Sequence, residues 1–342
     1  MGFGTLITKR YLASANFPKF ARLKLAHMAS NERILILGSE GQLGSELSAQ
    51  LQQKHGVENV ICTDIRNGQP DVARKFMELD VLNADAVEQV IIKENITTIY
   101  LLAAVLSAKG ETNPMFAWKL NMDSLLQVLQ LSVKHKVNRV FWPSSIAAFG
   151  PTTPKTDTPQ HPYMDPNTVY GVSKLSGELW CQYFFTRYGL DVRSLRYPGI
   201  ISWKTPPGGG TTDYAVEIFH EALKKGSYES FLHAQTSLPM MFIDDAIRAT
   251  LELMEAPADK VKERTSYNLA AMSFTPAELA AAIQKRLPDF KIGYKTDFRQ
   301  AIADSWPGSI DDSAARRDWG WQHRFDLDAL VDEMLNNLRD RV

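Results

Sequence analysis

The expected fold is decided by residues 34–44, which read Ile34-Leu35-Ile36-Leu37-Gly38-Ser39-Glu40-Gly41-Gln42-Leu43-Gly44. Four consecutive aliphatic residues predict a strand buried on both faces, because a half-exposed strand would alternate apolar with polar side chains. Three glycines follow at intervals of three, and residues 43–53 then carry apolar side chains at helical spacing. The stretch therefore predicts a strand, a tight glycine turn and a helix.

The same alternation continues along the first two thirds of the chain. We expect further strands at 59–63, 98–104, 139–144 and 192–197, and helices at 87–94, 116–135 and 169–187. Strands that alternate with helices favour an α/β fold with a doubly wound parallel sheet of the Rossmann type. The core domain is expected over residues 31–197.

The regular alternation of strand and helix patterns ends after Tyr197. Residues 206–210 read Pro-Pro-Gly-Gly-Gly, which predicts a loop. A strand at 239–243 and helices at 214–224, 244–255 and 276–285 are expected beyond it. We expect residues 198–342 to form mainly a smaller C-terminal substrate-binding lobe, from which some segments return to the main sheet.

Composition excludes several classes of function. Lys plus Arg number 38 and Asp plus Glu 39, so the net charge of -1 gives no indication of nucleic-acid binding. No apolar run reaches the roughly 18 residues that span a membrane. Cys62 and Cys181 lack partners at C-x-x-C spacing and the seven histidines are scattered, so we expect neither a disulfide framework nor a metal site.

Residues 1–30 differ in kind from the rest. Aromatic and aliphatic residues alternate with the bases Lys9, Arg10, Lys19, Arg22 and Lys24, and the first acidic residue is Glu32. A basic, acid-poor, amphipathic leader is typical of a mitochondrial transit peptide. The alternative is a vector-derived leader, because residues 27–30 read His-Met-Ala-Ser. Both interpretations exclude the leader from the fold; the first predicts the mitochondrial matrix and the second the cytoplasm.

The glycine turn indicates a dinucleotide site. Gly38 permits the turn, Gly41 lets the backbone approach a pyrophosphate, and Gly44 packs the helix on the strand. Asp64 lies 20 residues after Gly44, where a carboxylate accepts hydrogen bonds from the adenosine ribose. A carboxylate there would repel a 2′-phosphate and favours NAD over NADP, although Arg66 argues the other way. An ordinary turn is the alternative for both features.

A second motif indicates proton transfer. Tyr170 and Lys174 are four residues apart, so they share one face of the expected helix. A nearby cation lowers the pKa of a phenol from its ordinary value near 10. Ser144 and Ser145 end a strand about 25 residues upstream, where a hydroxyl could meet that phenol.

These motifs resemble the extended short-chain dehydrogenase/reductase family, in which a Ser or Thr, a Tyr and a Lys act together. The family places the hydroxyl five residues before a glycine, so Gly150 selects Ser145, with Ser144 as second choice. The later runs 195–202, 207–216, 238–243, 271–276 and 302–306 resemble the L-threonine 3-dehydrogenases of this family. The resemblance extends from about residue 32 to 328.

The resemblance implies NAD-dependent oxidation of the L-threonine 3-hydroxyl to 2-amino-3-oxobutanoate. Tyr170 then takes the proton, Ser145 orients the oxygen, and Lys174 lowers the pKa of Tyr170 and binds the cofactor ribose. The cofactor site is expected to include the three glycines, Asp64, Arg66, Tyr170 and Lys174. It is also expected to include Gln42, Leu43, Asp80, Leu101, Ala103, Asn121 and Tyr197.

The substrate site is expected to include Ser107, Gly210, Thr211 and Trp306. N–H groups and hydroxyls of residues 208–212 would bind the threonine carboxylate, and Trp306 would cap the methyl group. The alternatives are a surface connector for the loop, an ordinary core position for the tryptophan, and a cap of the following helix by Asp213.

Two other functions stay open: a nucleotide-sugar epimerase or dehydratase, and a non-catalytic dinucleotide sensor. The family resemblance also implies a homodimer through the helices at 116–135 and 169–187, and a 2-amino-3-oxobutanoate CoA ligase as downstream partner.

Overall fold

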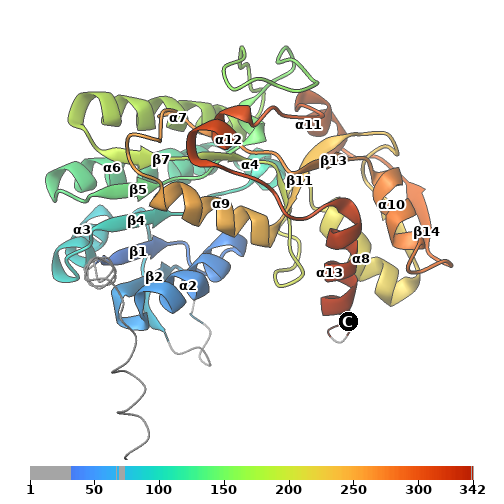
Figure 1. Ribbon diagram of the computed structural model, residues 1–342, viewed down its shortest axis with the longest axis horizontal. Coiled ribbons are helices and arrows are strands. Elements are labelled where there is room, and N and C mark those ends of the chain that lie inside the picture. Colours follow the sequence, from blue (N-terminus) through green and yellow to red (C-terminus); the bar gives the residue numbers. More distant parts are fainter. Residues whose placement is uncertain (1–31, 67, 69–73, 340, 342) are drawn as a thin grey trace, which may run out of the picture. The chain divides into compact units, whose positions relative to one another are not determined.

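The predicted first strand, β1 (Ile34–Leu37), lies inside a six-stranded sheet of a computed structural model that describes residues 32–66, 68, 74–339 and 341. The sheet has the order β3-β2-β1-β4-β5-β7, and each pair of neighbours is parallel. The other strands are β2 (Val60–Asp64), β3 (Lys75–Glu78), β4 (Thr98–Leu101), β5 (Arg139–Phe141) and β7 (Asp191–Arg193). This order confirms the predicted Rossmann-type α/β fold (Figure 1). The expectations for residues 1–30 lie outside the described residues.

Helices cover both faces of this sheet, as the apolar strands require. Ile34 and Ile36 belong to one hydrophobic cluster, whereas Leu35 and Leu37 belong to another. The first cluster includes residues of α2 (Gln42–His55) and α9 (Ile243–Glu255), which pack against each other. The second includes residues of α3 (Ala84–Lys93), α6 (Ser124–Lys134) and α7 (Val169–Tyr188). The sheet is therefore doubly wound.

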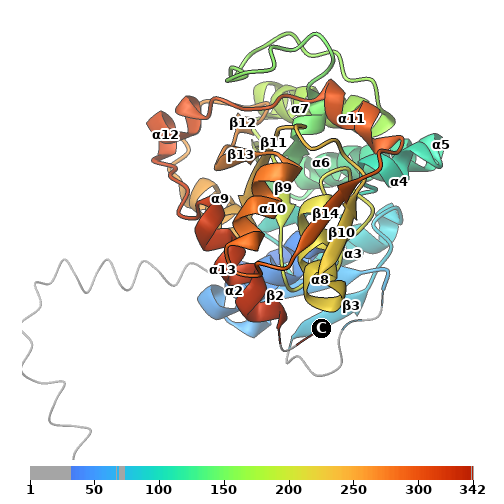
Figure 2. The same ribbon diagram turned by 90° about the vertical axis from the view of Figure 1, so that its right-hand side faces the viewer.

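The strands β5 and β7 continue beyond short breaks into β6 (Ser144–Ser145) and β8 (Leu195–Tyr197). These two pair in parallel, and β12 (Tyr267–Asn268) from the C-terminal half pairs with β8. The remaining strands are β9 (Gly199–Ile201), β10 (Ser227–Ser230), β11 (Leu238–Phe242), β13 (Met272–Phe274) and β14 (Lys291–Tyr294). The C-terminal helices are α8 (Tyr214–Lys225), α10 (Pro276–Gln284), α11 (Arg299–Ser305), α12 (Ser313–Trp319) and α13 (Leu327–Leu338), and α8, α10 and α13 pack together (Figure 2). The lobe boundary at residue 197 stays a prediction.

The expected helix over 116–135 is confirmed as one continuous helical run over 114–134, in which α5 (Pro114–Trp118), a π-helical turn (Lys119–Asp123) and α6 follow one another directly. The π-helical turn within it and the short helix α4 (Ser107–Glu111) before it were not predicted. Pro114 begins α5 because a proline lacks the N–H that a helix interior needs, and the Asn113 side chain caps the Phe116 N–H. The expected strands at 139–144 and 192–197 are each divided in two, and β3, which lies at the sheet edge, was not predicted.

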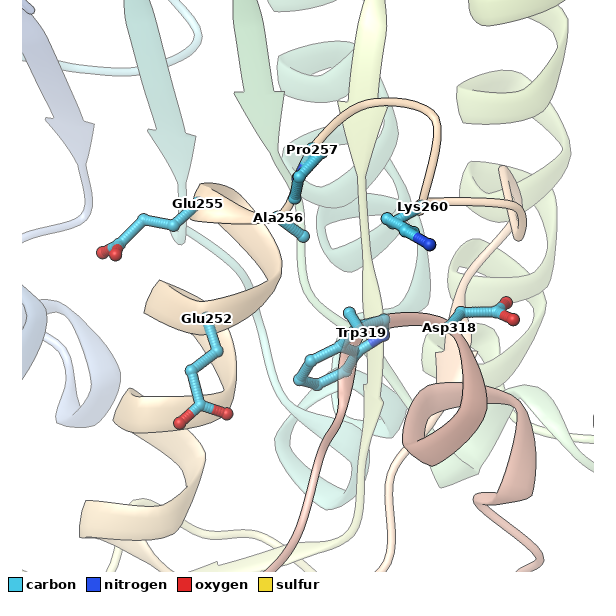
Figure 3. Close-up of a pocket in the computed structure, with 7 residues that line it drawn as sticks. All are labelled: Glu252, Glu255, Ala256, Pro257, Lys260, Asp318 and Trp319. Carbon is cyan, nitrogen blue, oxygen red and sulfur yellow. The ribbon is translucent and has the colours of Figure 1, made fainter. Parts of the chain in front are cut away.

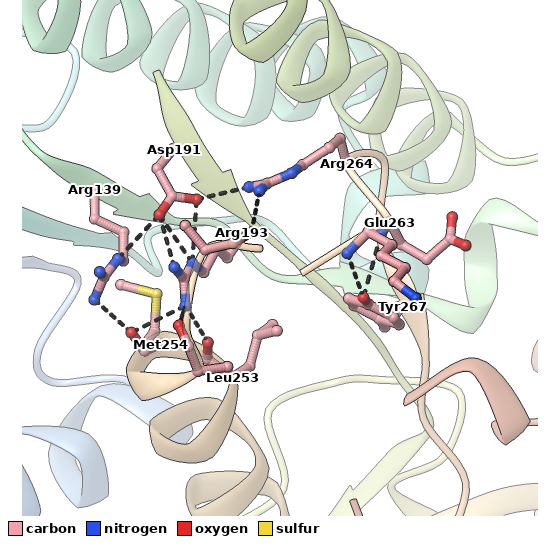
Figure 4. A network of polar contacts seen from close by, with 11 residues as sticks. Arg139, Asp191, Arg193, Leu253, Met254, Glu263, Arg264 and Tyr267 are labelled. Carbon is pink, nitrogen blue, oxygen red and sulfur yellow. Dashed lines mark hydrogen bonds and ion pairs between the residues drawn. The ribbon is translucent and has the colours of Figure 1, made fainter. Parts of the chain in front are cut away.

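A cluster of arginines joins the sheet to the end of α9 (Figure 4). The Asp191 carboxylate accepts from Arg139, Arg193 and Arg264 at 3.2, 2.7 and 2.7 Å. Arg193 is fully buried, and its Nη1 also donates to the carbonyls of Leu253, Met254 and Ala256. The cations thus neutralise the carboxylate and satisfy the carbonyl groups that a helix leaves free at its C-terminus.

No helix among the described residues is both long and apolar enough to cross a membrane. Cys62 in β2 and Cys181 in α7 are buried free thiols.

Candidate active site

The glycine turn after β1 is shaped by its neighbours. Gly38 has φ +96°, and a Cβ there would lie 2.6 Å from the Ala103 nitrogen that follows β4. A Cβ on Gly44 would lie 2.2 Å from the Gly38 oxygen, so this glycine brings α2 against the turn. At Gly41 a Cβ would meet only the Gly38 oxygen, at 3.5 Å. Nothing within the described chain requires Gly41, which leaves room there for an approaching ligand.

Asp64 ends β2 beside this turn and is almost fully buried. Its Oδ2 accepts from the Glu40 N–H at 3.0 Å and its Oδ1 from the Arg66 N–H at 3.0 Å. The Arg66 guanidinium donates to both oxygens at 3.0 and 3.1 Å. Burial is the largest influence and disfavours the carboxylate, but these hydrogen bonds outweigh it and lower the pKa of Asp64.

Tyr170 and Lys174 lie together near the start of α7. The Thr168 side chain caps the helix by accepting from the Gly171 N–H at 3.0 Å. Lys174 Nζ lies 5.4 Å from the Tyr170 ring centre and 4.4 Å from that of Trp142, and it donates to the Pro143 oxygen at 2.6 Å. Both residues are buried.

Burial is the largest influence on the pKa values of Tyr170 and Lys174. It raises the pKa of Tyr170 to about 12, although a hydrogen bond with Ser145 opposes the rise. It lowers the pKa of Lys174 to about 7, although Cys181 and Glu178 oppose the fall. In the chain alone, the expected lowering of the Tyr170 pKa is therefore not seen, because desolvation disfavours the phenolate more than its surroundings stabilise it.

The two serines have different partners. Ser145 hydrogen-bonds to Tyr170, whereas Ser144 donates to Glu178 Oε1 at 2.5 Å. Glu178 is one turn beyond Lys174 and forms a buried pair with Arg196, whose Nε and Nη2 lie 2.8 and 2.6 Å from its oxygens. This geometry favours Ser145 as the residue that meets a substrate hydroxyl. The Glu178–Arg196 pair was not predicted, although the spacing 170, 174, 178 places the three side chains on one helix face.

Ser107 and Thr211 meet at the carboxyl edge of the sheet. Their hydroxyl oxygens lie 3.2 Å apart and both residues are buried. The Asn121 side chain, in the π-helical turn, accepts from the Val105 N–H at 2.9 Å and donates to the Val105 oxygen at 3.2 Å. Asn121 also donates to Ser173 Oγ at 3.3 Å. Asn121 therefore fixes the segment between β4 and Ser107 against α7.

The glycine loop before α8 already contains an anion. Asp213 Oδ2 accepts from the N–H groups of Gly209 and Gly210 at 2.7 and 2.8 Å. Asp213 is the N-cap of α8 by position but forms no side-chain cap, which contradicts the alternative that Asp213 caps this helix. Burial raises its pKa, although the loop N–H groups oppose the rise. These two N–H groups, which were expected to bind a substrate carboxylate, are occupied by this side chain.

The remaining predicted cofactor residues have partners of their own, and Tyr197 is also the strand neighbour of Ser145 in the pairing of β8 with β6. Asp80 Oδ1 accepts from the Leu82 N–H in an exposed turn. The Tyr197 hydroxyl is paired with Thr250 in the core, and burial raises the Tyr197 pKa. Leu101 ends β4, and the Ala103 N–H donates to the Leu37 oxygen at 2.9 Å.

Trp306 is buried in the first hydrophobic cluster. Its carbonyl and that of Ser305, at the end of α11, accept from Lys155 Nζ at 3.2 and 2.8 Å. The segment that carries Trp306 is therefore tied to the loop after Gly150, and the role of its indole stays a prediction.

An open pocket lies at the end of α9 (Figure 3). It is lined by Glu252, Glu255, Ala256, Pro257, Lys260, Asp318 and Trp319. None of these is a candidate site residue. Its carboxylates Glu252, Glu255 and Asp318 are paired with Arg248, Lys54 and Arg317. Among the described residues, no cluster of His, Cys, Asp and Glu has the geometry of a metal site.

The turn fits the phosphates of a dinucleotide. The first N–H groups of α2 have no acceptor within the helix, its N-cap Gly41 supplies no side chain, and no acidic residue lies in its first turn. An anion placed beside Gly41 would satisfy these donors and the positive end of the helix dipole. Gln42 and Leu43, the first residues of α2, would contribute their N–H groups.

Comparisons with known proteins agree with this geometry. A model of the NAD dependent epimerase/dehydratase family matches residues 34–270. The chain is 50% identical over 311 residues to the mitochondrial L-threonine 3-dehydrogenase of Bos taurus, covering 90% of this chain and 83% of that protein. It resembles the holo form of the GalE-like L-threonine dehydrogenase from Cupriavidus necator, with 55% identity, a TM-score of 0.88, and coverage of 90% and 99%. It also resembles a monomeric L-threonine 3-dehydrogenase from a metagenome, with 46% identity, a TM-score of 0.87 and coverage of 90% and 99%. The chain therefore belongs to the NAD dependent epimerase/dehydratase family.

Proposed function

We propose that the chain is an NAD-dependent L-threonine 3-dehydrogenase, which oxidises the 3-hydroxyl of L-threonine to give 2-amino-3-oxobutanoate. The observation that carries the proposal is the contact of Ser145 with the buried pair Tyr170 and Lys174 at the edge of the Rossmann-type sheet. The two dehydrogenase relatives at 50% and 55% identity support the choice of substrate. When bound, NAD supplies the oxidant and takes the C3 hydrogen with its electron pair.

The protein residues then move one proton. Tyr170 Oη, as phenolate, accepts the proton of the 3-hydroxyl while the C3–O bond becomes a carbonyl. Ser145 Oγ, which hydrogen-bonds to Tyr170, orients the same substrate oxygen. Lys174, when protonated, stabilises the phenolate 5.4 Å from its ring centre and binds the cofactor ribose.

The substrate carboxylate is assigned to the junction of Ser107 and Thr211, next to Gly210. Their two buried hydroxyls provide donors at the carboxyl edge of the sheet, where ligands of such folds bind. Trp306 is assigned to the methyl group. Asp64 and Arg66 are assigned to the adenosine ribose, and Asp80, Leu101, Ala103, Asn121 and Tyr197 to the walls of the cofactor site.

The apolar outer face of α7 supports a homodimer. Leu179, Trp180, Tyr183 and Tyr188 are each at least 40% exposed, and α5, which packs on α7, exposes Met115 and Phe116. A large exposed patch of this kind is typical of an interface. Light scattering with size exclusion tests the homodimer, and a monomer, as named for the metagenome relative, would contradict it.

The leader and the Bos taurus relative support the mitochondrial matrix as location, with the cytoplasm as the alternative if the leader is vector-derived. The product is a β-keto acid, which decarboxylates readily, so a 2-amino-3-oxobutanoate CoA ligase is proposed as the downstream partner.

One assay separates the proposed activity from the alternatives. NADH formation is measured with L-threonine and NAD, and UDP-glucose is tested separately for epimerisation. NADH formed only with threonine supports the dehydrogenase. Conversion of the UDP-sugar would identify an epimerase or dehydratase, and cofactor binding without turnover of either substrate would identify a sensor.

A further inference from the structure

Glu40 lies in the glycine turn, between Gly38 and Gly41, and its backbone is tied to Asp64. The Glu40 N–H donates to Asp64 Oδ2 at 3.0 Å. The position therefore borders the carboxylate that we assign to the adenosine ribose. Only 9% of the Glu40 side chain is exposed, and its Oε1 lies 2.6 Å from Arg74 Nη1. Ser39 Oγ donates to the same oxygen at 3.2 Å.

The Arg74 guanidinium has unsatisfied hydrogen-bond donors among the described residues. Its side chain is 7% exposed, and its Nε and Nη2 are buried atoms that have no hydrogen-bond partner among the residues that the structure describes. An arginine carries five N–H donors in a fork that matches a phosphate. Burying such donors without acceptors costs free energy, which an additional anion beside Arg74 would recover. The single carboxylate of Glu40 therefore leaves this guanidinium incompletely satisfied.

Arg66 adds a second guanidinium, which is in contact with Asp64. It is bonded to both Asp64 oxygens, and 60% of its side chain is exposed. Two carboxylates, Glu40 and Asp64, thus alternate with two guanidiniums at the end of β2. A phosphate that enters this group meets repulsion from the carboxylates and attraction from the arginines, so the balance depends on which carboxylates are present.

We propose that Glu40, held by Arg74, is a second determinant of cofactor selectivity, which repels a 2′-phosphate on the adenosine ribose. We further propose that loss of the Glu40 charge turns Arg74 and Arg66 into a 2′-phosphate site. The inference rests on the proposed use of NAD and assigns to Glu40 and Arg74 a role that Asp64 alone was expected to fill. Specificity then arises from an unfavourable charge as much as from a favourable contact.

The test uses cofactor fragments and calorimetry. Adenosine 2′,5′-bisphosphate and 5′-AMP are titrated into the full-length protein at low salt, in an Asp64→Asn background that makes binding of the bisphosphate measurable. Glu40→Gln should raise the affinity for the bisphosphate relative to AMP by about tenfold. Arg74→Met should shift the same ratio in the opposite direction, because it leaves the Glu40 carboxylate without its cation.

Glu58→Gln is the matched control, since Glu58 is exposed at the opposite end of β2 and changes the total charge equally. It should leave the ratio unchanged. A ratio that is unmoved by Glu40→Gln, or that moves the same way in Glu40→Gln and Arg74→Met, would overturn the proposal. Retained AMP affinity shows that each variant is folded. Threonine is absent from the test, so a failure of the proposed oxidation cannot be mistaken for a failure here.

Discussion

Ser107 Oγ and Thr211 Oγ1 lie 3.2 Å apart although 104 residues separate them in the chain. Ser107 is the first residue of α4, which follows the carboxyl end of β4 after the segment 102–106, and Thr211 follows the glycine loop. The contact brings together the two hydroxyl groups that we assign to the substrate carboxylate. Each hydroxyl can donate to a carboxylate once their mutual hydrogen bond opens.

Thr211→Ala is therefore expected to raise the KM for threonine by about tenfold or more, because a hydrogen bond to a charged group contributes about 1.5–3 kcal/mol. The KM for NAD should change little. Steady-state kinetics with each substrate varied in turn provides the measurement. Thr205→Ala, in the same connection, serves as control, and an unaltered threonine KM in the Thr211 variant would show that the loop is only a connector.

Tyr170→Phe removes the hydroxyl that is proposed to accept the substrate proton while nearly preserving the volume of the ring. The expected loss in kcat is on the order of 10²-fold or more. NAD should still bind, as measured by quenching of protein fluorescence. Val172→Ala, two residues away on the exposed side of α7, should retain activity. Turnover close to that of the wild-type enzyme in Tyr170→Phe would exclude this residue as the base.

The rate should rise with pH because burial raises the pKa of Tyr170 to about 12, so the phenol is protonated near neutrality. The cationic ring of a bound oxidised nicotinamide and a protonated Lys174 both act to lower that value. We expect kcat/KM for threonine, with NAD saturating, to increase between about pH 6 and 9. In Lys174→Met the rise should move to higher pH. The nicotinamide ring is then the one remaining cation of the two, and it offsets less of the desolvation that raises the pKa of Tyr170. A rate independent of pH over this interval would contradict ionisation of Tyr170.

Asp191→Asn should destabilise the fold. Arg193 is fully buried, and without the carboxylate its charge loses its only ion-pair partner among the described residues. Breaking a buried pair in this way costs about 3–5 kcal/mol, which urea unfolding followed by circular dichroism would detect. Asp328→Asn, at an exposed ion pair, is the control and should have little effect. A similar urea midpoint for Asp191→Asn and Asp328→Asn would show that the carbonyls at the end of α9 are sufficient to satisfy Arg193.

The same carboxylate predicts a dependence on acid. Burial is the largest influence on Asp191 and opposes ionisation, but Arg193 and Arg264 outweigh it and lower the pKa. A carboxyl group whose pKa is lower in the folded state contributes stability that is complete above its unfolded pKa near 4. That contribution is lost as the pH falls below this value. The difference in unfolding free energy between wild type and Asp191→Asn should therefore shrink at acid pH.

Much of the fold could be predicted because its signals are local. Ile34–Leu37 is apolar at every position, and the positive φ of Gly38 and the close approach of Gly44 both require glycine. Tyr170 and Lys174 are neighbours by helical spacing alone. In each case the evidence lies within a few residues of sequence.

What could not be predicted depends on partners distant in the chain. Asp213 has the sequence position of a helix cap, yet its carboxylate accepts from N–H groups of the glycine loop, and only the folded backbone decides between these two sets of donors. Arg196 is unremarkable in sequence until β8 brings it against Glu178. Lys155 donates to backbone carbonyls about 150 residues away. Because every residue has a backbone carbonyl, the sequence does not indicate which ones a lysine will contact.

The pairing of β12 with β8 has a consequence for how the protein is made. Arg196 and Asn268, neighbours in this pairing, are 72 residues apart, so a growing chain that has just completed β8 presents an open sheet edge. At about 5–20 residues per second, synthesis of the missing strand takes several seconds. An unpaired edge is a template for pairing with another chain. Translation that pauses or stops before residue 268 should therefore yield an aggregation-prone product, whereas release after that point yields a covered edge.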